Sequence, residues 1–147
     1  MKIVPMEPAH YQWLVKLWST FSGNTMTGAD SIEAFRYFLE GNGLHCFSAF
    51  ENEVPAGSVM AGHDRRRGYV YHLAVREDLQ GSGIGRALME RAEKSLYDAG
   101  VEKIHLFIYS DNPAVEFYKR IGWHLRDDIV VLSKVLHGDK YTGTRKR

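Results

Sequence analysis

A glycine-rich stretch is the densest chemical signal in the sequence. Glycines at positions 81, 83 and 85 follow an apolar run that ends at Val75 and precede a helical run that begins at Ile84. Glycine lets the backbone approach a ligand closely, and the first N–H groups and the dipole of a helix favour phosphate. A plain turn is the alternative, but three alternating glycines exceed what a turn requires. The stretch predicts an anion site formed by Gln80, Gly81, Ser82, Gly83, Ile84, Gly85 and Arg86.

Two common nucleotide motifs do not match this stretch. The Rossmann fingerprint needs a third glycine where Arg86 stands, and the Walker loop needs Gly-Lys-Ser/Thr after four spacers. The stretch instead resembles the acetyl-CoA pyrophosphate loop of the GCN5-related N-acetyltransferase (GNAT) superfamily. The pattern of that loop, Gln/Arg-x-x-Gly-x-Gly/Ala, is met by Gln80, Gly83 and Gly85.

A second motif of the same superfamily follows further along the chain. It consists of an Asn, an Ala, a Phe-Tyr pair and a Gly-aromatic pair, here Asn112, Ala114, Phe117, Tyr118, Gly122 and Trp123. The family more often places the Asn seven residues before the Tyr, where this chain has Asp111. The resemblance covers about residues 56–136 and is nearest to small bacterial single-domain members of unassigned substrate.

The resemblance implies a role for each matching residue, with acetyl-CoA as co-substrate. Residues 80–86 would hold the pyrophosphate, and Asn112 would be a further ligand of the cofactor. The backbone of Leu73 and Val75, with Ala74 between them, would pair with the pantetheine arm as another strand does. An N–H in this segment would face the thioester carbonyl. Tyr118 would be the general acid that protonates the departing thiolate, because a phenol stays protonated at neutral pH.

The proton of the acceptor amine needs a separate acceptor, because an alkyl amine has a pKa of about 10.4. Relatives often carry Glu or His two or four residues before the position of Leu73, and this chain has Tyr71 and Tyr69 there. We therefore expect deprotonation through ordered water, with Tyr71 as a water relay or with help from Asp64 or Glu77.

His72 is the remaining candidate base, since an imidazole titrates near neutral pH. Strand alternation points His72 to the opposite face from Tyr71 unless a bulge intervenes. A histidine in the core, or one held by a hydrogen bond, is the plainer interpretation. Both interpretations stay open.

Two functions of different classes follow. The first is an enzyme, an N-acetyltransferase that moves an acetyl group from acetyl-CoA to a primary amine by direct attack in a ternary complex. The acceptor would be a small molecule or an amine of a peptide or protein. The second is an acyl-CoA-binding module with little or no turnover, which the missing Glu or His base and the displaced Asn112 favour.

The elements that must position these residues form a mixed α/β sheet, of the α+β kind that the superfamily shares. Apolar spacing predicts a strand, two helices, three strands, a helix, a strand, a helix and a last strand. Their expected ranges are 2–4, 8–21, 31–39, 45–50, 56–63, 69–75, 84–99, 102–109, 113–121 and 129–136. The three central strands form an antiparallel meander, and the glycine stretch opens the helix that follows it.

Composition limits the alternatives. With 147 residues, 44% of them hydrophobic and 25% charged, we expect one domain over residues 1–136 with a single core. The formal charge of +1 gives no chain-wide field for a nucleic acid or a membrane surface. The basic tail, residues 137–147, would dock on its own domain or on the partner of a homodimer.

The cysteine content and the hydropathy of the sequence indicate the compartment in which the protein works. Cys46 stands alone, which excludes an internal disulfide or a cysteine metal cage, and we expect no metal. The first twenty residues lack the continuous apolar core that is typical of a signal peptide, and no run approaches the roughly 18 apolar residues of a spanning helix. These features predict a cytoplasmic protein.

Overall fold

The computed structural model describes residues 1–21, 26–140 and 142–144. The chain forms two compact units, Met1–Leu106 and Phe107–Arg147, and each is described by itself. Of the predicted basic tail, Tyr141, Arg145, Lys146 and Arg147 lie outside the described residues, as do residues 22–25 of the loop between the first two helices.

A five-stranded mixed sheet forms the first unit, with the strands in the order in which they occur in the chain. The first four strands pair antiparallel, and the last two pair parallel. The elements are β1 (Lys2–Pro5), α1 (Tyr11–Ser19), α2 (Ile32–Asn42), β2 (Phe47–Glu51), β3 (Val54–His63), β4 (Gly68–Val75), α3 (Ile84–Asp98) and β5 (Ile104–His105). The predicted mixed sheet and its meander are confirmed.

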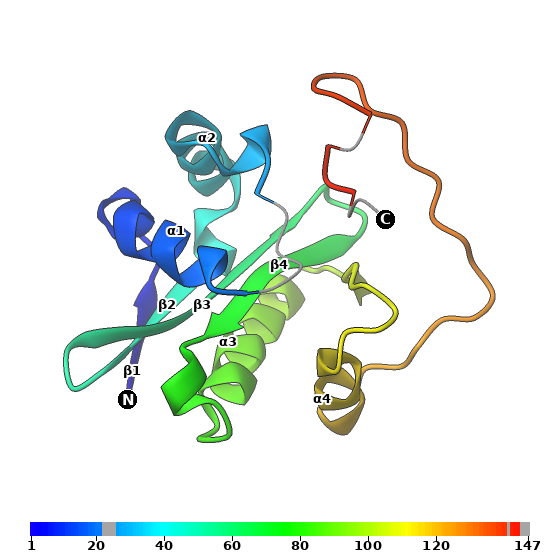
Figure 1. Cartoon of the computed structure of the whole chain (residues 1–147). Coiled ribbons are helices and arrows are strands. Elements are labelled where there is room, and N and C mark those ends of the chain that lie inside the picture. Colours follow the sequence, from blue (N-terminus) through cyan, green and yellow to red (C-terminus); the bar gives the residue numbers. More distant parts are fainter. Residues whose placement is uncertain (22–25, 141, 145–147) are drawn as a thin grey trace. The chain divides into compact units, whose positions relative to one another are not determined.

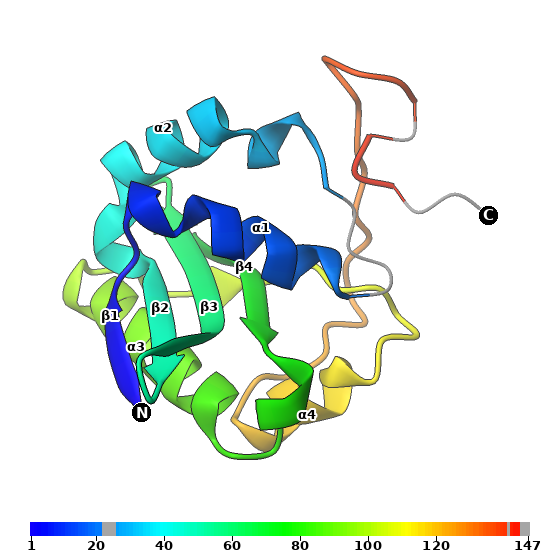
Figure 2. The same cartoon turned by 60° about the vertical axis from the view of Figure 1, so that its left-hand side comes forward.

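Helices cover both faces of this sheet. α1 and α2 pack on one face and α3 on the other, as Figures 1 and 2 show. The spacing of four residues that predicted α3 gives it a buried face of Ile84, Leu88, Met89, Ala92 and Leu96. On the opposite face of the sheet, the core is centred on Leu14, Trp18 and Phe35. Three layers therefore fix the strand and the helix that flank the glycine stretch.

A bulge interrupts β4. Ser58 of β3 pairs with Ala74, whereas Met60 pairs with Tyr71, so that two residues of β4 lie opposite Val59 alone. His72 has a φ of +47°, a left-handed conformation that a non-glycine residue rarely adopts. Such bulges are common beside active sites, where they redirect side chains.

The fold corrects two predicted strands. β5 has two residues instead of the predicted range 102–109, because its ladder with β4 ends at Tyr69, before the bulge. The predicted strand 129–136 is not formed, and Val130 and Leu132 are 83% and 92% exposed. A strand needs a neighbour for its N–H and C=O groups. Among the described residues of the second unit, α4 (Ala114–Arg120) is the one helix, and no strand offers an edge.

A buried histidine makes stability depend on pH. The His45 ring packs 5.2 Å from the His63 ring, and its Nδ1 is 2.9 Å from Ser95 Oγ. Burial, and then the proximity of His63, lower the pKa of His45 from its ordinary 6.5. Below that pH the unfolded chain binds more protons at this position than the folded chain. The contribution of His45 is therefore complete above pH 6.5 and is lost as the pH falls toward the lowered pKa.

We expect the free energy of unfolding to decline from about pH 7 to about pH 5, less steeply in a His45→Gln variant than in the parent. Denaturant titrations at several pH values measure both slopes. His124→Gln, which replaces an exposed histidine, is the control and should keep the parent's slope. Equal slopes in the parent and the His45→Gln variant would contradict the assignment.

Candidate active site

The glycine stretch forms the turn that leads into α3. Between β4 and α3 lies one short 3-10 turn, Glu77–Leu79, and the glycines follow it. Gly81 and Gly83 have φ values of +81° and +92°, and Gly83 is the N-cap of α3. A Cβ at either position would meet no atom within 4 Å, so backbone conformation, and not crowding within the chain, requires glycine here. The space that a side chain would fill stays open to a ligand.

The backbone donors of this turn face away from the helix interior. The hydrogen bond from Ala87 N to Gly83 O, 3.0 Å long, closes the first turn of α3. The N–H groups of the three residues before Ala87 therefore precede the intrahelical ladder, at the positive end of the helix dipole. The loop is exposed around them. This arrangement is suited to a phosphate or pyrophosphate group.

Polar side chains of the loop bond back to the protein. Gln80 Nε2 donates to Val75 O at 3.0 Å, and Ser82 Oγ donates to Leu79 O. Arg86 forms an exposed ion pair with Glu90, one helical turn further on. These bonds hold the loop in place and leave the backbone N–H groups for an anion.

The strand that leads into the loop has an uncovered edge. Arg76 N donates to Ala56 O at 2.8 Å, toward β3. Since successive backbone groups alternate in direction, the N–H of Val75 points to the other edge. The Leu73 N–H lies opposite the His72 carbonyl in one trans peptide group, and that carbonyl accepts from Ser58 of β3, so the Leu73 N–H points away from Ser58. In the described part of the chain, β5 covers that edge only as far as Tyr69. Apart from the Val75 carbonyl, which Gln80 binds, the remainder can accept an extended ligand as an additional strand.

A hydrogen-bonded cluster, which we call the bulge network, holds the bulge of β4 from the α1 side. Trp18 Nε1 donates to Ser58 Oγ at 2.9 Å, and Ser58 Oγ donates to the carbonyl of His72 at 2.8 Å. The His72 ring stacks on Trp18, with centroids 4.0 Å apart and planes inclined by 10°. Its Nε2 donates to Asp30 Oδ1 at 2.7 Å.

Sequence reasoning missed Ser58 and Asp30 as members of the site. A serine in the apolar run of β3 is an available signal, because a buried hydroxyl needs a partner. Asp30 offers no comparable signal. Its contact with His72 spans 42 residues and arises only from the fold.

The bulge also decides where His72 lies. Phe38 of α2 meets the Tyr71 ring edge-on at 5.9 Å, and Trp18 of α1 stacks on His72. The bulge therefore places the side chains of Tyr71 and His72 on the same face of the sheet, and strict alternation does not apply. His72 is held by a hydrogen bond to Asp30, as the plainer interpretation expected.

Protonation states in this region follow from burial and hydrogen bonding. Burial, and then nearby Tyr69, raise the pKa of Tyr71, so its hydroxyl stays protonated at neutral pH. Burial opposes the charge of Asp30, but the hydrogen bonds from His72 and from the Thr27 N–H hold the pKa of Asp30 below its ordinary value. Tyr71 can therefore relay a proton but does not act as an anionic base.

Two further candidates lie away from the cluster. Asp64 is in the turn before β4, where its Oδ1 accepts from the N–H groups of Arg66 and Arg67 at 2.8 Å each. The glycine loop follows the opposite end of β4, which at about 3.3 Å per residue is roughly 20 Å away. Glu77 lies exposed in the 3-10 turn after β4.

The second unit carries the two remaining candidates. The Tyr118 ring on α4 packs near Phe117 and Trp123, with centroids 5.3 and 5.9 Å away. Burial raises the pKa of Tyr118 to about 12. Asn112 Oδ1 accepts from the N–H of Ala114, the first residue of α4, at 2.9 Å, and Pro113 is the N-cap of that helix. That bond occupies one oxygen lone pair of the side chain that the resemblance assigns to the cofactor.

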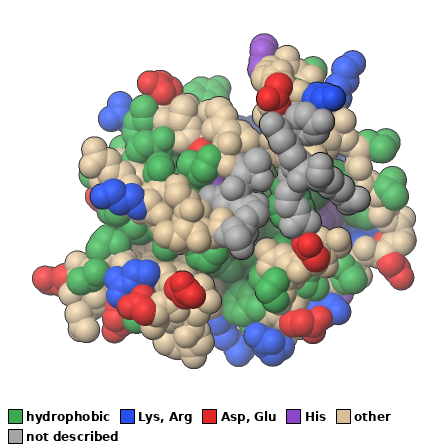
Figure 3. Space-filling view, in the orientation of Figure 1, with side chains coloured by type: hydrophobic (Ala, Val, Ile, Leu, Met, Phe, Trp, Pro, Cys, Tyr) green, Lys and Arg blue, Asp and Glu red, His purple; other side chains and the backbone are tan. Residues whose placement is uncertain are grey.

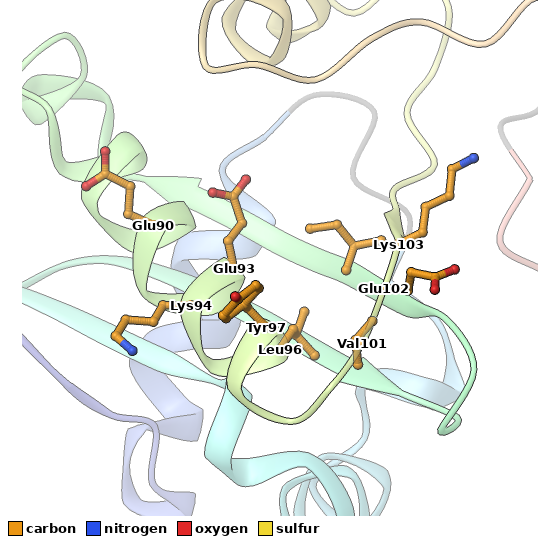
Figure 4. A pocket seen from close by; sticks show the side chains of 9 residues that line it. Glu90, Glu93, Lys94, Leu96, Tyr97, Val101, Glu102 and Lys103 are labelled. Atoms are coloured by element: carbon orange, nitrogen blue, oxygen red, sulfur yellow. The ribbon is translucent and has the colours of Figure 1, made fainter.

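An open groove of about 640 Å³ lies elsewhere on the first unit. Figure 4 shows side chains of α3, among them Glu93 and Tyr97, on one side and residues 101–104 on the other. None of the predicted site residues lines it.

Over the elements of the first unit, the Lys and Arg side chains visible in Figure 3 lie singly or in small groups beside acidic ones.

The described residues form neither a metal site nor a membrane-spanning helix. No three His, Cys, Asp or Glu side chains gather there to hold a metal ion. None of the helices described has the length and apolar composition to cross a bilayer.

Cys46 provides a test of the core. Its side chain is fully buried, and burial raises the pKa of the thiol to about 11. We expect an aromatic disulfide reagent to label the native protein at neutral pH far more slowly than the denatured protein, because the thiolate is the reactive form. Absorbance of the released thiolate measures both rates. Equal rates in the two states would contradict the packing of Cys46.

Comparison with known proteins agrees with this geometry. The model of the acetyltransferase (GNAT) family matches residues 9–123. An acetyltransferase of Sodalis glossinidius is 40% identical over 85 residues, which are 57% of this chain and 60% of that protein. An acetyltransferase of Pectobacterium atrosepticum is 40% identical over 91 residues, 61% of this chain and 64% of that protein. The chain thus spans less than two thirds of the length of these relatives.

Solved structures show the same fold at lower identity. A putative acetyltransferase from Agrobacterium tumefaciens has a TM-score of 0.73 and 21% identity, over 91% of this chain and 100% of that one. An aminoglycoside 6'-N-acetyltransferase from Acinetobacter haemolyticus has a TM-score of 0.73 and 15% identity, over 93% and 100%. At such identities the likeness concerns the fold alone.

Proposed function

The chain belongs to the acetyltransferase (GNAT) family, and on that premise we propose that it transfers an acetyl group from acetyl-CoA to a primary amine. The transfer takes place by direct attack in a ternary complex. The observation that carries the proposal is the glycine turn, in which Gly81 and Gly83 hold left-handed conformations with open space where a side chain would lie. A turn that served the fold alone would not need an open approach to the first N–H groups of α3.

Two features of the first unit suit two parts of acetyl-CoA. The N–H groups at the start of α3 would hold the pyrophosphate, and the uncovered edge of β4 at Leu73 and Val75 would pair with the amides of the pantetheine arm. When bound, acetyl-CoA supplies the acetyl group as an activated thioester. Asn112 retains its side-chain N–H groups for the cofactor, since the bond to Ala114 uses only its oxygen.

We assign a group of the protein to each step of the acetyl transfer. The Leu73 N–H stabilises the negative charge that develops on the carbonyl oxygen as the amine attacks. The new nitrogen–carbon bond forms while the carbon–sulfur bond breaks. Tyr118 donates its phenolic proton to the sulfur, a role that its pKa of about 12 supports because the phenol stays protonated. The proton of the amine leaves through ordered water, with the Tyr71 hydroxyl as relay.

The acceptor reaches the thioester from the face that α1 and α2 cover. Tyr71 is 44% exposed on that face and packs against Phe38. The acceptor is a small molecule or an amine of a peptide or protein. One structural neighbour is described as an aminoglycoside N-acetyltransferase, and aminoglycosides belong in the first panel of amines.

Measurements of acetyl-CoA binding and of amine turnover together distinguish acetyl transfer from an acyl-CoA-binding module. Acetyl-CoA should raise the melting temperature, and at least one amine of the panel should release free coenzyme A thiol above the rate of hydrolysis. Acetyl-CoA binding without thiol release from any amine would favour an acyl-CoA-binding module. Absence of binding would contradict both functions.

A further inference from the structure

The peptide bond between His72 and Leu73 is held at one end by a directed chain of hydrogen bonds. An indole N–H only donates, so Ser58 Oγ accepts from Trp18 Nε1 and keeps its own proton for the His72 carbonyl. The N–H at the other end of the same peptide group is that of Leu73. The donor and the acceptor of each hydrogen bond in this series are therefore fixed, from the Trp18 indole to the peptide group that carries the Leu73 N–H.

The hydrogen bonds from Trp18 through Ser58 to His72 lie in the core. Trp18 is 1% exposed and Ser58 is 0% exposed. A buried hydroxyl costs free energy unless it is hydrogen-bonded, and an apolar residue at position 58 would avoid that cost. Ser58 both accepts and donates, so its polar atoms are satisfied by this one arrangement. Any rotation of the His72–Leu73 peptide would break it.

The side chain of His72 fixes the same peptide from another direction. Its φ of +47° is unfavourable for a non-glycine residue. The hydrogen bond to Asp30 and the stack on Trp18 oppose relaxation of that conformation. The bulge is therefore held by contacts from α1, from β3 and from the turn before α2.

We propose that Trp18 and Ser58 are positioning residues of the acetyl transfer, which fix and polarise the peptide whose N–H, that of Leu73, faces the thioester oxygen. The inference rests on the proposed function. Hydrogen bonds in series strengthen one another, so donation to the His72 carbonyl makes the Leu73 N–H a better donor. Asp30 and His72 keep the peptide at the bulge.

The expected effect is on the chemical step. Loss of a whole oxyanion donor lowers kcat by about 10²–10³-fold, and loss of the bond that orients and polarises it should lower kcat by about tenfold. The bulge network does not include the glycine turn. Affinity for acetyl-CoA should therefore stay within about twofold of the parent.

Ser48 offers a matched control. It is the neighbour of Ser58 on β2, is likewise 0% exposed, and bonds to His10 at 2.9 Å instead of to β4. Ser58→Ala and Ser48→Ala both remove a buried hydroxyl and should destabilise the protein similarly. Trp18→Phe removes the indole N–H from the start of the chain and keeps an aromatic ring.

The test combines kinetics with a readout on the protein without substrate. In the ¹⁵N-labelled protein, the Leu73 amide proton should shift upfield in Ser58→Ala and Trp18→Phe but not in Ser48→Ala. With an active amine, kcat should fall in the first two variants and stay unchanged in Ser48→Ala, with the acetyl-CoA melting shift retained in all three.

The positioning role and the acetyl transfer itself fail on different outcomes. An unmoved Leu73 amide, or equal kcat in Ser58→Ala and Ser48→Ala, would overturn the positioning role. A parent that binds acetyl-CoA but acetylates no amine would contradict the proposed function, while the amide shift would still decide whether the chain polarises the peptide.

Discussion

Replacing Gly83 with aspartate should abolish the rise in melting temperature that acetyl-CoA produces. Gly83 has a φ of +92° with nothing within 4 Å of its missing Cβ. A carboxylate there would occupy the space of the pyrophosphate and repel it. At 100 times its dissociation constant a ligand stabilises by about 2.7 kcal/mol, which for a chain of 147 residues is roughly 5–10 °C. We expect that shift in the parent and none in the variant.

Gly100 provides the control for backbone strain. It follows the other end of α3, has a φ of +83°, and also has nothing within 4 Å of its missing Cβ. Gly100→Asp should therefore lose about as much stability as Gly83→Asp, yet keep the full acetyl-CoA shift. Differential scanning fluorimetry with and without acetyl-CoA measures both quantities. A parent-like shift in Gly83→Asp would exclude the glycine turn as the pyrophosphate site.

Changing Tyr118 to phenylalanine should lower kcat by about 100-fold or more, the usual contribution of general acid catalysis. The ring and its packing on Phe117 and Trp123 are kept, and only the proton donor is lost. The KM for acetyl-CoA should change by less than about twofold, which would place the loss in the chemical step. Because burial raises the pKa of Tyr118 to about 12, the parent should show no loss of kcat from this group up to about pH 10.

Tyr97 is the matched tyrosine for this test. It lies on α3 in the open groove and is 79% exposed. Tyr97→Phe should leave kcat and KM at the parent's values. Steady-state kinetics with one amine, over a range of pH, measures all three proteins. A loss of less than a few fold in Tyr118→Phe would show that another group protonates the thiolate.

The glycine turn was predictable because its signal is local. The alternating glycines and the apolar spacing of α3 lie within one stretch, and left-handed backbone at Gly81 and Gly83 needs no distant partner. The antiparallel meander was predictable for the same reason, since short turns join its strands. Such features follow from the residues that form them.

The bulge network was not predictable, because it depends on contacts between distant segments. Trp18 and Ser58 are 40 residues apart, and Asp30 and His72 are 42 apart. Alternation also gave no sign that β4 carries an extra residue at the bulge. The run 129–136 shows the opposite error, since its apolar pattern predicted a strand for which the described part of the second unit holds no pairing edge. An apolar pattern indicates which face of a strand would be buried, but a strand forms only where a neighbouring strand can pair with it.

The central claim is direct acetyl transfer to an amine, and the fate of a labelled acetyl group tests it most directly. Acetyl-CoA labelled in its acetyl group is incubated with the protein and an active amine, and thiol, amide and free acetate are quantified in the same reaction. We predict one labelled amide for each thiol released, with no label on the protein. Label that accumulates as free acetate or on the protein would contradict direct transfer to an amine.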